Sequence, residues 1–112
     1  MTVENGAMEQ QMSVYIMTNK PRGTLYIGVT GGLIGRVWQH RTHALPGFTD
    51  LYNLDKLAWY EMHAAPTTAL QREKSLKRWY RQWKIELIEK ANPDWRDLWY
   101  EICPEAGADA RA

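Results

Sequence analysis

Two short β-rich segments near the start of the chain constrain its fold more than any other feature. Residues 13–18 read S-V-Y-I-M-T and residues 24–29 read T-L-Y-I-G-V. Both segments are rich in β-branched and aromatic residues, and the intervening N-K-P-R-G consists of turn-forming or polar residues. The sequence therefore predicts a β-hairpin.

Each strand of this predicted hairpin carries a tyrosine followed by an isoleucine, with Tyr15 on the first strand and Tyr26 on the second. A turn centred between Lys20 and Pro21 would place the tyrosines nearly opposite each other on one face, with Cβ atoms ~5 Å apart. Such a pair is either an aromatic packing contact, worth ~0.2–1 kcal/mol, or two phenols placed side by side for chemistry. The hairpin alone leaves both interpretations open.

The rest of the chain alternates between helical and strand patterns. The expected elements are a helix at 33–43, a loop at 44–53, a strand at 56–62, and helices at 66–79, 83–90 and 94–100. This order predicts an α+β fold, with a small three-stranded antiparallel or mixed sheet flanked by helices. One domain is expected at 13–102, between disordered tails at 1–12 and 103–112. Five tryptophans are expected to pack in the core: Trp38, Trp59, Trp79, Trp95 and Trp99.

The composition limits the setting in which the protein acts. Cys103 is the single cysteine, which excludes an intramolecular disulfide, and the opening residues do not resemble an export signal. No apolar run reaches the ~18 residues of a membrane span. We therefore expect a freely soluble cytoplasmic protein with no membrane partner. Residues 13–100 hold thirteen Lys and Arg against eight Asp and Glu, a balance that suits a polyanionic partner.

The motifs that follow the hairpin resemble those of the GIY-YIG nuclease superfamily, in particular its small single-domain bacterial members described as predicted endonucleases. The resemblance runs from about Ser13 to Tyr100 through T-N-K-P-R-G-T-L-Y-I-G-V-T, an R-x-x-x-H helix, K-L-A-W-Y-E, A-L-Q-R-E-K-S-L-K-R-W and N-P-D-W-R-D-L. In one departure, the first signature triplet is S-V-Y, which lacks the glycine and isoleucine of the family but keeps the phenol of Tyr15. The resemblance implies the GIY-YIG fold and a metal-dependent DNA endonuclease.

The resemblance also implies a set of catalytic residues: Tyr15, Tyr26, Arg36, His40 and Glu73. Arg36 and His40 are four residues apart on one helical face, so the guanidinium can bind phosphate while the imidazole reaches a phenol. A tyrosine is a poor base at its ordinary pKa of ~10, so nearby positive charge has to lower that pKa. The sequence does not decide which of the two tyrosines is the base.

Glu73 is the expected ligand for Mg²⁺ or Mn²⁺, because Mg²⁺ commonly binds through one or two carboxylates together with substrate phosphate. Its ordinary alternative role is an ion pair with Lys77, four residues further along the helix. The expected nucleic-acid contacts are a basic stripe and one asparagine: Lys74, Lys77, Arg78, Arg81, Lys84 and Asn92. The stripe could equally be a solvated face, and Asn92 could simply end a helix before Pro93.

Nothing in the chain resembles a base-reading module, so we expect target choice by DNA structure or by a targeting protein rather than by sequence. Two other hypotheses stay open: a nucleic-acid-binding module without catalysis, and an interaction protein whose tyrosines merely pack. The sequence also does not decide between DNA and RNA as the substrate, and it does not fix the oligomeric state. The endonuclease hypothesis requires the five catalytic side chains to converge on one surface.

Overall fold

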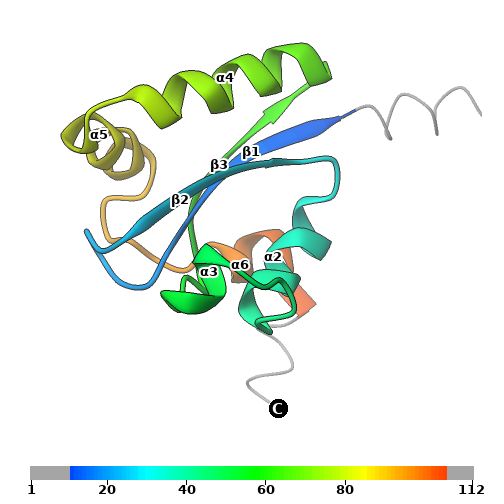
Figure 1. Ribbon diagram of the computed structural model, residues 1–112, viewed down its shortest axis with the longest axis vertical. Helices are drawn as coiled ribbons and strands as arrows, with labels where there is room; N and C mark the ends of the chain where they lie inside the picture. The colour runs from blue at the N-terminus through cyan, green and yellow to red at the C-terminus, as the bar shows by residue number, and fades with distance from the viewer. Residues whose placement is uncertain (1–10, 106–112) are drawn as a thin grey trace, which may run out of the picture.

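The computed structural model describes residues 11–105 and contains a three-stranded antiparallel sheet in the order β2-β1-β3 (Figure 1). Its elements are β1 (Met12–Thr18), β2 (Leu25–Thr30), α2 (Leu33–Arg41), α3 (Phe48–Leu51), β3 (Lys56–His63), α4 (Pro66–Arg78), α5 (Arg81–Ala91) and α6 (Trp99–Ile102). Helices α4 and α5 lie on one side of the sheet, and α2, α3 and α6 lie on the other. The predicted α+β fold is confirmed.

Most of the predicted disordered tails, residues 1–10 and 106–112, lie outside the described residues. Of the part that is described, Cys103 packs against a buried cluster that includes Trp99. Strand β1 begins at Met12, one residue before the predicted start of the domain. None of the helices within residues 11–105 has the length and apolar character that crossing a membrane requires.

The central strand β1 is buried on both of its faces, because alternate side chains of a strand point to opposite sides of the sheet. Val14 and Ile16 pack on one side and Tyr15 and Met17 on the other, each at most 1% exposed. The first side forms the α4–α5 core, made of Val14, Ile16, Ile27, Ala58, Trp59, Ala69, Leu76 and Ile88. The second forms the α2–α6 core, made of Tyr15, Met17, Val37, Leu54, Leu57, Leu98 and Trp99.

The register of the hairpin differs from the predicted one by two residues. Tyr15 pairs with Gly28, and Tyr26 pairs with Met17. The predicted pairing, which set the two tyrosines nearly opposite each other, is therefore wrong by two residues. They are diagonal neighbours that still share one face of the sheet, with ring centroids 6.3 Å apart.

The turn explains this shift of register. The N–H of Gly23 donates to the carbonyl of Lys20 at 2.9 Å, which closes a four-residue turn with Pro21 at its second position. Proline is favoured at that position because its ring fixes the backbone φ angle that the turn requires. The turn is thus centred between Pro21 and Arg22, one residue later than the even spacing of the tyrosines indicated.

Two of the predicted elements after β2 also differ in the structure. The segment expected to be a loop at 44–53 contains the short helix α3. The helix expected at 94–100 begins only at Trp99, because the preceding residues form an irregular segment held by Asp97. The Asp97 Oδ1 atom accepts the N–H groups of Leu57 and Trp99, each at 3.1 Å.

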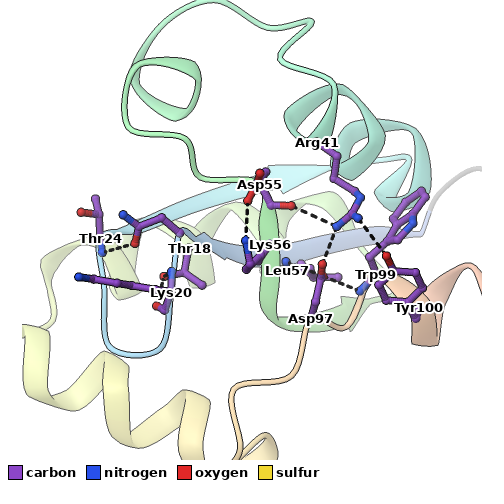
Figure 2. A network of polar contacts seen from close by, with 11 residues as sticks. Thr18, Lys20, Thr24, Arg41, Asp55, Lys56, Leu57, Asp97, Trp99 and Tyr100 are labelled. Carbon is purple, nitrogen blue, oxygen red and sulfur yellow. Dashed lines mark hydrogen bonds and ion pairs between the residues drawn. The ribbon is translucent and has the colours of Figure 1, made fainter. Parts of the chain in front are cut away.

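Asp97 also ties this segment to the end of α2, as Figure 2 shows. Arg41 donates to Asp97 Oδ2 at 2.6 Å and to the carbonyl of Asp55 at 3.2 Å, and its guanidinium lies 5.2 Å from the centroid of the Trp99 ring. The contact fastens the C-terminal turn of α2 to α6 and β3. His40 precedes Arg41 in that turn, so the same contacts help to set its position.

The tryptophans follow the core prediction with one exception. Trp59 and Trp99 are 5% exposed, and Trp79 and Trp95 pack against the α4–α5 core. Trp38 is 55% exposed and stacks on the outside of Trp99, with ring centroids 6.0 Å apart. The prediction that Trp38 packs in the core is wrong, because Val37 and His40 occupy the buried side of α2.

Candidate active site

The centre of the candidate site is a contact between Tyr15 and His40. Tyr15 is 1% exposed in the middle of β1, and its hydroxyl lies 2.9 Å from His40 Nε2. Helix α2 turns His40 toward the sheet together with the buried Val37, three residues earlier. A phenol and an imidazole in hydrogen-bond contact can pass a proton between them.

The other ring nitrogen of His40 is held by Thr49. His40 Nδ1 lies 3.0 Å from Thr49 Oγ1, so both nitrogens have partners inside the protein. Thr49 was not among the predicted site residues, because it lies in a segment expected to be a loop. No periodic pattern connects α3 to α2, so only the folded chain reveals this contact.

Burial lowers the pKa of His40 to about 4, and the positive charge of the nearby Arg36 acts in the same direction. The imidazole is therefore neutral at neutral pH, with one nitrogen able to accept a hydrogen bond. When that nitrogen is Nε2, Tyr15 donates its hydroxyl proton to His40 and His40 donates Nδ1–H to Thr49.

Tyr26 completes a group of three rings. Its centroid lies 5.6 Å from that of His40, matching the separation of 5.6 Å between Tyr15 and His40. Tyr26 belongs to the edge strand β2 and is partly exposed, whereas Tyr15 is buried. Of the two phenols, Tyr26 is the one that solvent reaches more readily.

Gly28 makes room for the ring of Tyr15. The two residues pair across the β1–β2 ladder, and a Cβ atom added at Gly28 would lie 2.6 Å from both Cζ and the hydroxyl oxygen of Tyr15. Any larger residue would displace the phenol from its place beside His40. The glycine that ends Y-I-G is therefore required by the packing of the tyrosine on the neighbouring strand.

Arg36 and Glu73 both act electrostatically on Tyr15. Burial raises the pKa of Tyr15 most strongly, the neighbouring Tyr26 and the negative charge of Glu73 add to the rise, and Arg36 opposes it by its charge and its interaction with the phenol. Arg36 thus has the expected effect, but burial outweighs it. Tyr15, Tyr26 and His40 contact one another through their rings, and Arg36 and Glu73 lie near enough to influence the pKa of Tyr15. Tyr15 and His40 are buried, so the partly exposed members of the predicted set are Tyr26, Arg36 and Glu73.

Glu73 is the candidate metal ligand. Its side chain is 13% exposed on α4, and its carboxylate lies 2.7 Å from Lys77 Nζ, so the ion pair considered from the sequence is present. Within residues 11–105, no group of three or more His, Cys, Asp or Glu is arranged to hold a metal ion. A single carboxylate still fits Mg²⁺, which retains most of its waters and completes its shell with substrate phosphate.

The expected basic stripe divides into two kinds of residue. Lys77 is paired with Glu73, and the Arg81 guanidinium donates to the carbonyls of Arg22 and Gly23 in the hairpin turn. Lys74 and Arg78, by contrast, are exposed, and their helical positions point away from the buried Ala69 and Leu76. They are the members of the stripe best placed to meet a phosphate backbone.

The side chain of Asn92 is buried and hydrogen-bonded to the backbone. It is 2% exposed, its Nδ2 atom donates to the carbonyls of Ala58 and Arg96 at 3.0 and 2.9 Å, and its Oδ1 atom accepts the N–H of Arg96 at 3.0 Å. These bonds close the turn after α5 against β3. We therefore do not include Asn92 among the proposed nucleic-acid contacts.

Comparison with known proteins adds one finding to this geometry. A family model of the GIY-YIG catalytic domain matches residues 11–86. The matched segment contains Tyr15, Tyr26, Arg36, His40 and Glu73 and stops before Asn92. No curated protein and no solved structure gives a significant match to the chain.

Proposed function

Because the chain belongs to the GIY-YIG family of endonuclease domains, we propose that it cleaves DNA in a metal-dependent reaction carried out by five residues: Tyr15, Tyr26, Arg36, His40 and Glu73. The family indicates hydrolysis of phosphodiester bonds. The contact of 2.9 Å between the Tyr15 hydroxyl and His40 Nε2, with Tyr26 beside it, is the observation that supports this choice of residues.

In the proposed reaction, the Tyr15–His40 pair removes a proton from the attacking water. Tyr15 passes its own hydroxyl proton to His40 Nε2 as it takes one from water, so the phenol never has to ionise alone. The lowered pKa of His40, about 4, keeps the imidazole neutral at neutral pH, so Nε2 has a free lone pair, but it also makes the imidazole a weak base that holds the transferred proton only briefly. Tyr26, the more exposed phenol, hydrogen-bonds the water or the phosphate.

In the proposed reaction, Arg36 and Glu73 help to neutralise the negative charge of the phosphate. The planar guanidinium of Arg36 presents paired donors that match two phosphate oxygens. Glu73 would hold Mg²⁺ or Mn²⁺, which when bound neutralises the phosphate and stabilises the leaving oxygen. Because Lys77 already pairs with this carboxylate at 2.7 Å, we expect weak metal binding until nucleic acid is present.

The proposed substrate is DNA selected by its structure or by a targeting protein. Lys74 and Arg78 are the exposed cations that we propose as phosphate contacts, and such contacts carry little sequence information. Each neutralised phosphate steepens the dependence of affinity on salt by a slope of about 0.9 in log units. Binding should therefore weaken with salt on every DNA, whatever its sequence.

The test is cleavage by the full chain of branched, nicked, single-stranded and duplex DNA, with Mg²⁺, Mn²⁺ or EDTA. Tyr15→Phe, Arg36→Ala and Glu73→Ala should each lower the rate by about 10²–10⁴, the range for a lost proton-transfer or charge-stabilising group. Tyr15→Phe retains the packed ring but leaves His40 Nε2 without its partner, so it should lower the free energy of unfolding by about 1–3 kcal/mol, which the same experiment checks by urea denaturation. Tyr80→Phe and Glu86→Ala, which alter exposed residues of the same types, should cleave at the wild-type rate.

Three outcomes separate the hypotheses. Loss of cleavage in the three variants alone supports the proposed centre. Salt-sensitive binding without metal-dependent cleavage by the wild type would indicate a non-catalytic nucleic-acid-binding module. Equal nicking by wild type and variants would indicate a contaminating nuclease.

A further inference from the structure

The short helix α3 and its C-terminal cap expose three large apolar side chains beside the candidate active site. Phe48 is 48% exposed, Leu51 is 75% exposed and Tyr52 is 48% exposed, and we call these three residues the α3 rim. Their spacing of three and four places them on one side of the helix, away from Asp50. Large apolar groups gathered in solvent usually mark a surface that binds something.

The α3 rim is continuous with the rings of the candidate site. Phe48 stacks on Tyr26 with centroids 6.4 Å apart and an angle of 29° between the rings. Tyr52 in turn lies 4.7 Å from Phe48. An unbroken series of rings therefore leads from Tyr15 through Tyr26 and Phe48 to Tyr52 at the surface.

Thr49 shows that the position of this rim is tied to the catalytic groups. It lies on α3 between Phe48 and Asp50, it is 6% exposed, and its hydroxyl lies 3.0 Å from His40 Nδ1. A single helix thus holds the histidine from one side and presents aromatic rings to solvent from the other. A nucleic acid with one phosphate at Tyr26 would therefore place the adjoining nucleotides close to Phe48.

The chemistry of the α3 rim favours a nucleobase that has left the stack. Flat aromatic rings bind bases through their faces, with little regard to sequence. In an intact duplex both faces of each base are covered by its neighbours, so an external ring gains little from a paired base. An unpaired base, by contrast, offers a free face and costs least to bring out of the helix.

We propose that the α3 rim is a subsite for an unpaired nucleobase adjacent to the scissile phosphate, so that the preferred substrates carry unpaired nucleotides at the cut. The inference rests on the proposed nuclease function for the location of the phosphate. It names the structural feature of DNA that the protein selects. Tyr52 and Phe48 supply the stacking faces, and Leu51 extends the apolar surface.

The test measures binding without cleavage, in EDTA, to a DNA stem–loop that carries the fluorescent base 2-aminopurine either in its loop or in its stem. Stacking on Tyr52 should quench the fluorescence of the loop base and leave that of the stem base unchanged. Tyr52→Leu retains apolar bulk but removes the ring, and it should weaken binding of the loop by about tenfold, within the range for one lost stack. Binding of a fully paired duplex should change by less than about twofold, because no base face is lost there.

Two further variants distinguish stacking from a general disturbance of the protein. Tyr52→Trp keeps an aromatic face and should restore binding of the loop. Tyr80→Ala removes an aromatic side chain that is 72% exposed outside the α3 rim, at the junction of α4 and α5, and should bind the loop as the wild type does.

The results can overturn the inference independently of the nuclease proposal. Equal weakening of loop and duplex binding by Tyr52→Leu, or unchanged binding of both, rules out a stacking subsite. If the wild type cleaves no DNA with any metal but Tyr52→Leu still loses the preference for the loop, the nuclease proposal fails and the subsite stands. Melting temperatures of all variants, measured alongside, show whether each is folded during the binding assay.

Discussion

The two faces of the central sheet are equally buried but chemically different. The residues of the α4–α5 core, Val14 and Ile16 among them, are aliphatic apart from Trp59. The α2–α6 core receives Tyr15 from the same strand and encloses the hydrogen-bonded pair of Tyr15 and His40. One strand therefore packs apolar side chains on one side and a hydrogen-bonded phenol on the other, while the proposed metal ligand Glu73 comes from α4, which lies on the first side.

The difference shows what a polar group needs in order to be buried. An unpaired buried hydroxyl or imidazole costs free energy, whereas a paired one costs little. The series Tyr15, His40 and Thr49 provides a partner at each step. Within residues 11–105, no buried side-chain nitrogen or oxygen lacks a hydrogen-bond partner. We therefore expect the α4–α5 core to control stability and the α2–α6 core to control the chemistry.

The largest stability effect should follow from a cavity in the α4–α5 core. Ile16 is fully buried, so Ile16→Ala should lower the free energy of unfolding by about 2–5 kcal/mol, as measured by urea denaturation. Its side chain points away from Tyr15, so the turnover of the folded variant should stay within about twofold of wild type. A turnover loss comparable to that of Tyr15→Phe would show that the two faces are not separate in function.

Acid should weaken the α2–α6 core through His40. The pKa of His40 is about 4 in the folded protein and 6.5 for the free side chain. Between these two pH values, His40 is mostly protonated in the unfolded chain and mostly neutral in the folded one. Stability from this residue is complete above pH 6.5 and declines as the pH falls toward 4, by roughly 2–3 kcal/mol. Urea titrations across this range should show the decline in wild type.

His40→Gln is the matched variant for this measurement. It removes the titrating group, so the decline between pH 6.5 and 4 should be shallower than in wild type, whatever its overall stability. Identical slopes for wild type and His40→Gln would contradict the assignment.

The smallest of the three effects concerns the space beneath Tyr15. In Gly28→Ala, the new Cβ atom would lie 2.6 Å from the phenol, and the resulting overpacking should cost about 1–3 kcal/mol. Cleavage should fall as well, because the hydroxyl leaves its place beside His40. Denaturation and single-turnover cleavage measure the two losses.

Gly35→Ala provides a control of opposite sign. Gly35 lies within α2, and a Cβ atom added there would meet nothing within 4 Å. Because alanine favours helix over glycine, this variant should be more stable than wild type by about 0.5–1 kcal/mol. A similar loss of stability in both variants would remove the steric explanation for Gly28.

The features predictable from the sequence were those that depend on local pattern. The strands, α2 and α4 follow from runs of β-branched residues, helical periodicity and the proline that begins α4. The presence of Tyr15 and Tyr26 on one face also followed, because a register shift of two residues preserves the face of every side chain. The register itself was wrong because it was inferred from the tyrosines instead of from the four-residue turn at Lys20–Gly23.

The features that could not be predicted join distant segments. Helix α3 has four residues and no distinctive local pattern. The sequence therefore gave no indication that Thr49 would contact His40 or that Phe48 would contact Tyr26. Asn92 resembled a functional residue by type and order, but its bonds to Ala58 and Arg96 depend on where β3 lies.

The sequence by itself determined that β1 would place apolar and phenolic side chains alternately on two faces, since a strand has a period of two whatever surrounds it. Only the tertiary structure decided which helices cover those faces. It placed His40 beside Tyr15, Glu73 within electrostatic reach of the same phenol, and three exposed apolar residues at the rim. These placements depend on the packing of segments separated by tens of residues, and packing is a property of the whole chain.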